Sequence, residues 1–266
     1  MELNFCSLSS GSSGNCYYLG NAFNGILIDA GIPAGAIRKS LKNIGISMDA
    51  LMGVLVTHNH SDHIRGLELL GRKNNLPVFT TNKIWKSVVP RIKITSGITV
   101  REIALQQKFH LAGFDIEAFP VSHDAPETIG FHIGARDQKI TIATDLGHIC
   151  QTSAPYFEAA NLLVIESNYD EKMLMHGSYP HFLKARILSD HGHLGNHQCA
   201  AFLANMPGKN LRHICLAHLS NQNNTPDLAL QTLQQVFAEK GIELNGKPQI
   251  SILNRNTPSE LIRLSD

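Results

Sequence analysis

The stretch Thr57-His58-Asn59-His60-Ser61-Asp62-His63 lies directly after the apolar residues 51–56, which the hydrophobic pattern predicts as a buried strand over residues 51–57. His58 and His60 are two residues apart, so in an extended segment their side chains project from the same face. Asp62 and His63 follow where a helix is predicted over residues 62–73, with Asp62 as a candidate cap. Four ligand-type side chains within six residues can form two clusters for two adjacent metal ions. The alternative is a solvated polar turn, but a random chain rarely gives this spacing.

Three further candidate ligands stand at the ends of predicted strands. His123 follows residues 114–121, Asp145 follows residues 139–144, and His218 follows residues 213–217. A single histidine at a strand end is more often structural, but these residues complete a set with the first stretch. We expect one metal ion to be held by His58, His60 and His123, a second by Asp62, His63 and His218, and Asp145 to bridge both.

The ligand types indicate hydrolytic chemistry. Imidazole and carboxylate suit Zn²⁺, with Mn²⁺ or Fe as alternatives, and the chain is rich in histidine, with 14 among 266 residues. No cysteine belongs to the set, which argues against a closed structural zinc site. Two divalent ions about 3.5–4 Å apart can activate a water molecule and stabilise a developing oxyanion.

Composition narrows the class of protein. Hydrophobic residues make up 43% and charged residues 17% of the chain, as in a globular protein, and the net charge of +1 excludes attraction to nucleic acid by charge alone. No apolar stretch approaches the roughly 20 residues of a transmembrane helix, and the N-terminus has no basic signal region. Five widely spaced cysteines without a CxxC pair are typical of reduced thiols in a cytoplasmic protein.

Strand and helix patterns alternate along the chain and predict an α/β or α+β fold in which helices cover the sheets, as a single domain over residues 1–266. Besides those above, strands are predicted over residues 25–29, 129–134 and 162–166, and helices over residues 33–44, 183–188, 197–204 and 226–239. The Gly/Ser-rich residues 9–15 are predicted to form a tight loop between two strands, with phosphate binding by their backbone as the alternative.

The order Asp29, HxHxDH over residues 58–63, His123, Asp145 and His218 resembles that of the metallo-β-lactamase-fold hydrolases. The resemblance implies an αβ/βα four-layer sandwich, in which two mixed β-sheets are flanked by helices and the metals lie at one edge. It also implies that Asp29 supports the metal ligands without being one. The sequence departs from the true β-lactamases and looks more like the nucleic-acid branch of this superfamily.

A second resemblance concerns a general acid. Residues 162–166, ending in Glu166, and Asp190-His191-Gly192-His193-Leu194 resemble the Glu and His signature of tRNase Z, a phosphodiesterase. It implies that Glu166 orients His193 and that His193 protonates the leaving oxygen. Ile165 stands where that family has a His, and Leu194-Gly195 replaces a Ser-Thr step, so only the central pair carries over. The alternative makes His191 and His193 turn residues that cap the helix over residues 197–204.

The sequence is most similar to the bacterial YycJ/WalJ-type subgroup. The similarity rests on residues 9–18, Asn168-Tyr169-Asp170, residues 187–194, Ala217-His218-Leu219-Ser220 and Asn223-Asn224-Thr225-Pro226, while Gly195 departs from the usual Ser. It implies an exonuclease-like enzyme that acts on DNA in the 5′ to 3′ direction, which favours DNA over RNA as the substrate and leaves RNA as the alternative.

A basic segment favours a polyanionic substrate independently of the resemblance. Between Glu68 and Glu102 there are seven basic residues and no acidic one, so the rest of the chain carries a net charge of −6. Lys83, Trp85 and Lys86 combine two cations with an aromatic ring, as expected for backbone contact and base stacking. The alternative is a solvated face with a core tryptophan.

These observations predict a dinuclear metal phosphodiesterase in which a metal-activated hydroxide attacks phosphorus and His193 protonates the departing oxygen. Asp62, Asp145, His193 and Glu166 are the residues expected to act in catalysis. One rival is a lactonase or thioesterase that uses the same metals on an acyl carbon. Another is a metal-binding partner protein without catalysis, although an intact ligand set argues against it.

Overall fold

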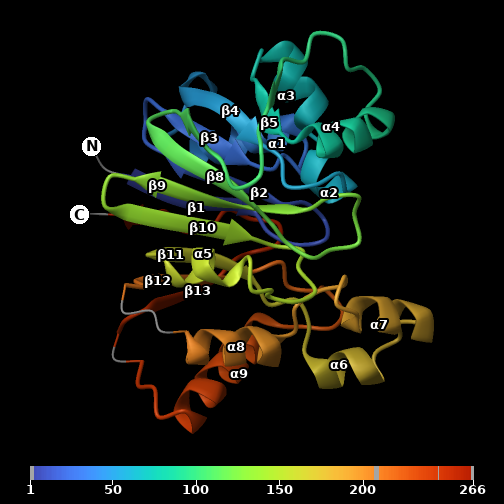
Figure 1. Cartoon of the computed structure of the whole chain (residues 1–266), viewed down its shortest axis with the longest axis vertical. Helices are drawn as coiled ribbons and strands as arrows, with labels where there is room; N and C mark the ends of the chain where they lie inside the picture. Colours follow the sequence, from blue (N-terminus) through green and yellow to red (C-terminus); the bar gives the residue numbers. More distant parts are fainter. Residues whose placement is uncertain (1–2, 207–209, 245, 265–266) are drawn as a thin grey trace.

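The computed structural model describes residues 3–206, 210–244 and 246–264. Two seven-stranded sheets lie face to face, and helices cover the outer side of each (Figure 1). Both sheets contain parallel and antiparallel pairs. This arrangement confirms the predicted sandwich of two mixed sheets flanked by helices.

The first sheet is built mostly from the N-terminal half of the chain, in the order β14-β1-β2-β3-β4-β5-β6. Its strands are β1 (Leu3–Ser9), β2 (Cys16–Gly20), β3 (Gly25–Ile28), β4 (Leu51–Leu55), β5 (Val78–Thr80), β6 (Val100–Glu102) and β14 (Ile262–Leu264). The C-terminal strand β14 pairs with β1, so both ends of the described chain lie at the same side of the molecule (Figure 1).

The second sheet has the order β13-β12-β11-β10-β9-β8-β7. Its strands are β7 (Lys108–Leu111), β8 (Phe114–Pro120), β9 (Ile129–Ala135), β10 (Gln138–Ala143), β11 (Leu162–Glu166), β12 (His213–Ala217) and β13 (Gln249–Ile252). From β10 to β13 the neighbouring strands are parallel.

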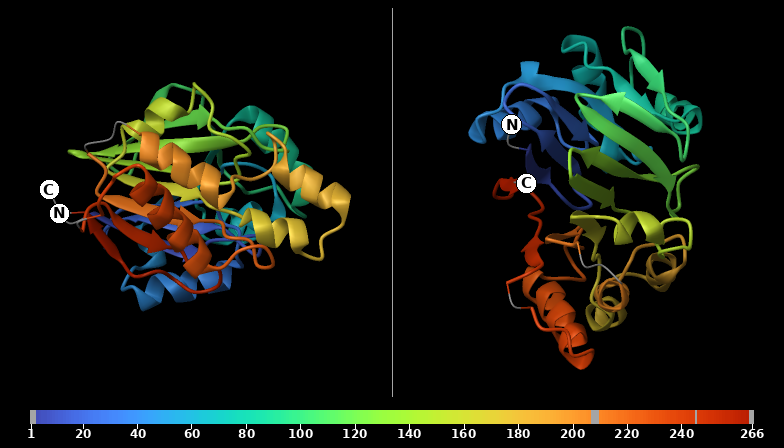
Figure 2. Two further views of the ribbon diagram at one scale, coloured as in Figure 1. Left: turned by 90° about the horizontal axis from the view of Figure 1, so that it is seen from below. Right: turned by 60° about the vertical axis from the view of Figure 1, so that its left-hand side comes forward.

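Helices cover the two outer faces and one end of the sandwich (Figures 1 and 2). The first sheet is covered by α1 (Ala34–Asn43), α3 (Leu67–Lys73) and α4 (Asn82–Val88), and the second by α5 (Ala154–Glu158), α8 (Asn196–Asn205) and α9 (Pro226–Glu239). Short helices α2 (Ser61–Ile64), α6 (Glu171–His176) and α7 (His181–Leu188) lie at the end away from the termini. Single turns η1 (Met48–Ala50) and η2 (Val89–Arg91) precede β4 and follow α4.

Alternation along the central strands separates two hydrophobic layers. In β11, Leu162 and Val164 belong to the core shared by the two sheets, whereas Leu163 and Ile165 pack toward α5, α8 and α9. All four side chains are fully buried. A strand covered on both faces is expected to be apolar throughout, which is the pattern seen in the sequence.

Strand direction places the candidate ligands at one edge. β3 and β4 run parallel in the first sheet, and β10, β11 and β12 run parallel in the second. The loops that follow parallel strands emerge at the same edge of a sheet. Here that edge lies between α4 on one side and α7 on the other (Figure 1).

The helix predicted over residues 62–73 is interrupted, which corrects the prediction. It consists of α2 and α3, separated at Arg65-Gly66, and the N-cap of α2 is His60 rather than Asp62. The Gly66 N–H donates to the Ala30 carbonyl (2.7 Å), and a Cβ at Gly66 would lie 2.5 Å from the Ile32 carbonyl oxygen. The chain packs closely against the loop after β3 at Gly66, and this packing interrupts the helix.

The loop over residues 9–15 joins β1 and β2, as predicted. Four of the five cysteines are buried and Cys150 is half-buried, and all five are free thiols. Within the described ranges, none of the helices has the length and apolar character needed to cross a bilayer.

Candidate metal centre

The loop after β4 carries the first histidines into the gap between the sheets. Its backbone is extended through His60, and α2 then begins at Ser61, so His58 and His60 precede the turn and His63 lies within it. His58 and His63 are fully buried, whereas His60 and Asp62 are half-buried. Within this stretch, His58 and His63 are therefore closed off from solvent, whereas His60 and Asp62 are partly open to it.

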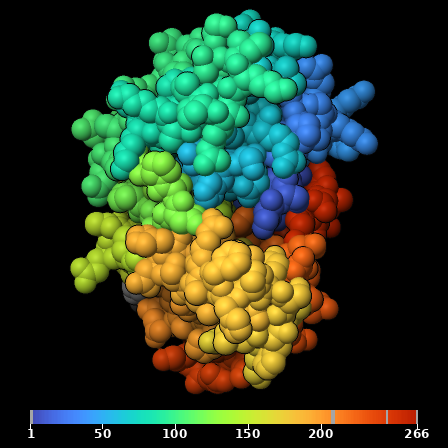
Figure 3. Space-filling model, turned by 90° about the vertical axis from the view of Figure 1, so that its right-hand side faces the viewer, coloured from blue at the N-terminus to red at the C-terminus, as the bar shows by residue number. Residues whose placement is uncertain are grey.

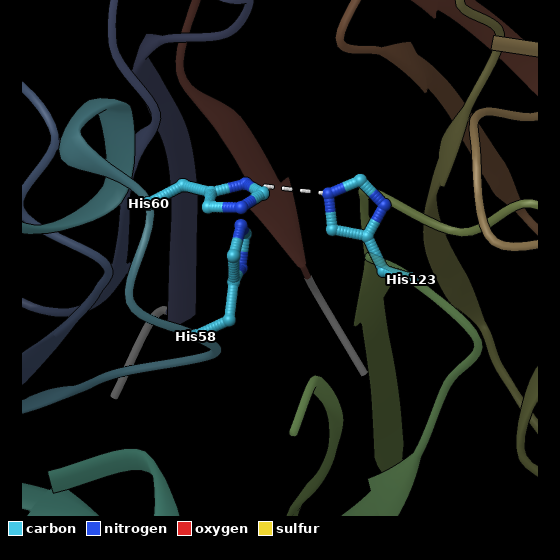
Figure 4. Close-up of side chains that lie close together, drawn as sticks. All are labelled: His58, His60 and His123. Carbon is cyan, nitrogen blue, oxygen red and sulfur yellow. Dashed lines mark hydrogen bonds between the residues drawn. The ribbon is translucent and has the colours of Figure 1, made fainter. Parts of the chain in front are cut away.

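The first cluster consists of three imidazoles from two loops. One ring nitrogen from each of His58, His60 and His123 lies within 4.8 Å of the others. Figure 4 shows the three rings turned toward one another, and the His123 Nε2 lies 3.4 Å from the His60 Nδ1. The other nitrogen of His123 lies 2.9 Å from the Gly192 carbonyl, which fixes this ring. The structure brings together the three residues predicted for one metal ion.

The second predicted cluster also converges. Asp62, His63 and His218 present ligand atoms within 4.8 Å of one another. Asp145 lies between the two clusters, with Oδ2 3.0 Å from the His63 Nε2 and Oδ1 3.7 Å from the His123 Nε2. This is the position required of a carboxylate that contacts two neighbouring ions.

Asp29 holds the ring of the candidate ligand His63 through the nitrogen that faces away from the cluster. Its Oδ2 lies 2.7 Å from the His63 Nδ1 and accepts from the Thr57 hydroxyl, while Oδ1 accepts from the Thr57 backbone N–H. The carboxylate therefore leaves the His63 Nε2 to face the cluster. The structure places Asp29 behind a candidate ligand, where the resemblance implied it would lie.

Three of these residues have strained backbones. Asp29 and His218 follow β3 and β12 directly and have φ of 59° and 56°, and Asp145 follows β10 after Thr144 and has φ of 58°. The left-handed conformation costs a residue with a Cβ roughly 1–2 kcal/mol. Strain of this kind persists where the surrounding structure enforces it, typically at functional sites. Here it recurs at the ends of three strands that contribute to a single cluster.

Glu166 joins the two sides of the cluster. Its Oε1 lies 2.8 Å from the His193 Nδ1 and 2.7 Å from the His218 Nδ1, and its Oε2 accepts from the backbone N–H groups of Leu146 and Leu194. His193 therefore lies where the resemblance predicted a general acid. It does not cap α8, whose N-cap is Gly195, and the His191 Nδ1 lies 2.9 Å from the Ser122 hydroxyl.

The electrostatics favour bound cations. Burial alone would raise the pKa of Asp145, but the neighbouring His218 and His63 hold it well below its usual range. Burial alone would lower the pKa of His218, but Asp145, Asp62 and Glu166 raise it to about 10. A field that retains protons on buried imidazoles also favours divalent ions, which compete for the same nitrogens.

The residues fit a metal centre on an observation independent of motif order. Among the described residues, the buried Nε2 atoms of His58 and His218 have no hydrogen-bond partner. Burial lowers the pKa of His58 well below its usual range, so its imidazole is neutral, the form that binds metals. Buried polar atoms without a partner are rare and costly, and metal coordination would satisfy both nitrogens.

Sequence reasoning missed two residues of the site. Asn15 places its Nδ2 2.9 Å from the His63 Nε2 and 3.4 Å from the Asp62 Oδ2. Asp124 places its Oδ1 3.2 Å from the His123 Nε2 and binds Arg186 of α7 through its Oδ2. The position of Asp124 directly after His123 was the available signal. For Asn15 the signal was an amide at the end of a loop otherwise rich in Gly and Ser.

The basic segment lies beside the metal centre. The Asn59 amide, between His58 and His60, donates to the Ser87 carbonyl of α4 (3.2 Å). Lys83 and Lys86 of this helix are exposed. Trp85 is half-buried and packs against the main hydrophobic core, which was the alternative to a stacking role.

The comparisons with known proteins agree with this geometry. A family model described as a β-lactamase superfamily domain matches residues 24–218, which include every candidate ligand. The chain belongs to the metallo-β-lactamase superfamily. It is 35% identical to exodeoxyribonuclease YycJ of Bacillus anthracis over 98% of this chain and 99% of that protein. It is also 35% identical to exodeoxyribonuclease WalJ of Streptococcus pneumoniae serotype 2 (strain D39) over 87% of each.

The solved structures show the same fold. The metallo-β-lactamase fold protein YhfI from Bacillus subtilis matches with a TM-score of 0.74 at 14% identity, covering 99% of this chain and 100% of that one. These findings confirm the resemblance and establish a metallo-β-lactamase superfamily hydrolase whose His/Asp clusters imply divalent metal ions.

Proposed function

We propose that this metallo-β-lactamase superfamily member is a dinuclear metal-dependent phosphodiesterase that degrades DNA from the 5′ end. The Glu166–His193 pair carries the proposal, because it adds a proton donor on the open side of the ligand clusters. The names of the relatives YycJ and WalJ as exodeoxyribonucleases support the choice of DNA.

The ligand roles follow the clusters in the structure. His58, His60 and His123 would hold one ion, Asp62, His63 and His218 would hold the other, and Asp145 lies near both clusters and would serve both ions. Zn²⁺ suits these nitrogen and oxygen donors best, with Mn²⁺ or Fe as alternatives. When bound, the two ions supply an activated water molecule and neutralise the phosphate charge.

His193 moves the proton to the leaving group. Its Nδ1 is bonded to Glu166, so its Nε2 is the nitrogen that can donate to a substrate oxygen. The ring lies 5.2 Å from that of His123 and 5.3 Å from that of His218, measured between centroids. Its side chain is 21% exposed, whereas that of His218 is 2% exposed. Of His123, His193 and His218, His193 is therefore the imidazole that substrate reaches from solvent.

The direct test uses metal-loaded protein with single- and double-stranded DNA and RNA labelled at either end. We expect mononucleotides to be released from the 5′ end of DNA, and His60→Ala to abolish the release because it removes a ligand. Hydrolysis of a lactone or thioester without cleavage of any strand would contradict the proposal. Absence of all hydrolysis with two metals bound would contradict it as well.

Reversing the charge on α4 should affect long substrates selectively. The Lys83 side chain is 64% exposed, with Nζ 3.9 Å from the Glu127 Oε1, and Lys86 lies one turn further along the helix. Removing one cation that binds a phosphate lowers the salt dependence of binding, by about 0.9 in the slope of log K against log salt for duplex DNA. We expect the variant K83E/K86E to bind duplex DNA at least tenfold more weakly at low salt, with a shallower salt slope.

The matched control for α4 is K39E/K42E on α1, which has the same spacing and also exposes both lysines. It changes the net charge equally but lies on a different helix. Titrations of labelled DNA at several salt concentrations compare the two variants. Equal weakening in both would show that only net charge matters.

A further inference from the structure

The helix α7 presents an exposed aromatic side chain among cations. Phe182 has a relative exposure of 76%, the highest among the exposed large hydrophobic residues of the described chain. The helix has the sequence His181-Phe182-Leu183-Lys184-Ala185-Arg186-Ile187-Leu188 and contains two permanent cations and no acidic residue. Leu183 and Ile187 pack into a small apolar cluster with Tyr169 and Leu174, which secures the inner face of the helix. The exposed ring has no role in that packing.

A chain of contacts links this helix to the metal centre. Arg186 binds the Asp124 Oδ2 through its Nε, and the Asp124 Oδ1 lies 3.2 Å from the His123 Nε2. The Arg186 side chain is 56% exposed, so its remaining guanidinium N–H groups can donate to another group. Arg186 on α7 is therefore linked to the candidate ligand His123 through a single residue, Asp124.

Helix geometry places Phe182 on the same face of α7 as Arg186. Residues four apart in a helix are neighbours on one side, with Cβ atoms about 5–6 Å apart. Phe182 thus lies one turn from Arg186 on the same side of α7. A strand whose terminal phosphate lies between the ions would reach Arg186 first and Phe182 next.

We propose that Phe182 and Arg186 form a binding surface for single-stranded nucleic acid, in which the Phe182 ring stacks on a base and Arg186 contacts the backbone. This inference rests on the proposed function and specifies the substrate of the same site as a strand with unpaired bases near its scissile end. Cationic grooves that carry aromatic rings are the usual means of holding unpaired strands. A second copy of the chain is the less suitable occupant, because cations interrupt the apolar surface of α7.

The position of α7 opposite α4 supports this assignment. In the space-filling view of the metal-centre edge, the residues around α4 cover the upper half and α6 and α7, in yellow and orange, cover the lower half (Figure 3). Lys83 and Lys86 are exposed residues of α4, and Phe182 and Arg186 are exposed residues of α7. A nucleic acid at the metal centre would therefore meet positive charge on both sides.

The test measures binding with a single-stranded oligodeoxynucleotide that carries 2-aminopurine near its 5′ end. Metal-loaded H193A slows cleavage during the measurement and serves as the parent. We expect Phe182→Ala to raise the Kd about tenfold, the effect typical of removing one base–aromatic stack, and to abolish most of the 2-aminopurine quenching. Phe182→Trp should retain both, because the larger ring also stacks.

The matched control is Phe23→Ala, which removes a ring of nearly equal exposure (72%) from the turn between β2 and β3, at the opposite end of those strands from Asn15 and Asp29. It should leave Kd and quenching unchanged. Metal content and melting temperature confirm that each variant is folded.

The outcomes separate this inference from the proposed function. If the unmodified enzyme degrades DNA but Phe182→Ala binds the oligonucleotide as tightly as its parent, the inference fails and the function stands. If Phe182→Ala instead shifts a dimer to a monomer in sedimentation without changing Kd, the surface is a contact between copies and the inference also fails. If the unmodified enzyme neither binds nor degrades DNA, the proposed function fails first.

Discussion

Replacing His193 with alanine is expected to lower kcat on DNA by about 10²–10⁴, the range for loss of a general acid. The imidazole is held by Glu166 at 2.8 Å and belongs to neither of the two clusters assigned to the metal ions, although one of its ring nitrogens lies within 4.8 Å of ligand atoms of Asp145, Glu166 and His218. Burial alone would lower the pKa of His193, but the Glu166 carboxylate raises it above its usual value, which favours the protonated ring. Removing the side chain therefore removes a proton donor while both clusters remain complete.

Metal content distinguishes this role from a structural one. H193A should retain two metal ions per chain after dialysis, and a substrate with a p-nitrophenolate leaving group should lose less activity, since that group departs without a proton. His191→Ala is the matched control, because its exposed ring contacts Ser122 and lies two residues away. Loss of metal together with activity in H193A would show that His193 is a ligand or a structural support.

The ligand set could be predicted from the sequence for two reasons. Four candidates are closely spaced in residues 58–63, and the others follow predicted strands. HxHxDH places four side chains within six residues, and the other candidates follow apolar segments that fold as β8, β10 and β12. A buried strand reads as an apolar run, and its end is marked by the first polar residue. Asp145 and His218 were recognisable for that reason, and the structure brings both to the cluster.

Other parts of the molecule depend on contacts that a sequence does not display. The break at Gly66 arises from packing against Ala30 in the loop after β3, a contact between segments 36 residues apart in the chain. Strands β5, β6, β7, β13 and β14 were not predicted, because each has only three or four residues and lacks an apolar run like that of β3. Asn15 and Asp124 reach the centre through loop geometry. The sequence alone did not show whether the Trp85 ring packs against the core, and the structure shows that it does.

Glu166→Gln should be as damaging as the loss of His193, and in a different way. The Glu166 Oε2 accepts from two backbone N–H groups, so the carbonyl oxygen of a glutamine would remain there and its amide NH₂ would face His193 and His218. An NH₂ group only donates, so both rings would have to accept at Nδ1 and carry their proton on Nε2. The His218 Nε2 is the atom directed at Asp62 and Asp145, and once protonated it cannot bind a metal ion.

We therefore expect E166Q to lose metal as well as activity, with affinity for the ion at His218 about 10–100-fold weaker, as is typical when the partner of a ligand is replaced. Metal content after dialysis should fall from two ions toward one, and kcat should fall at least as far as in H193A. Glu117→Gln is the matched control, because this carboxylate also accepts a hydrogen bond, from the Tyr156 hydroxyl, but lies on β8 outside the clusters. The double variant H193A/E166Q distinguishes between two roles of Glu166. A further loss of metal would show that Glu166 fixes His218 directly, whereas full retention of both ions would restrict its role to orienting the general acid.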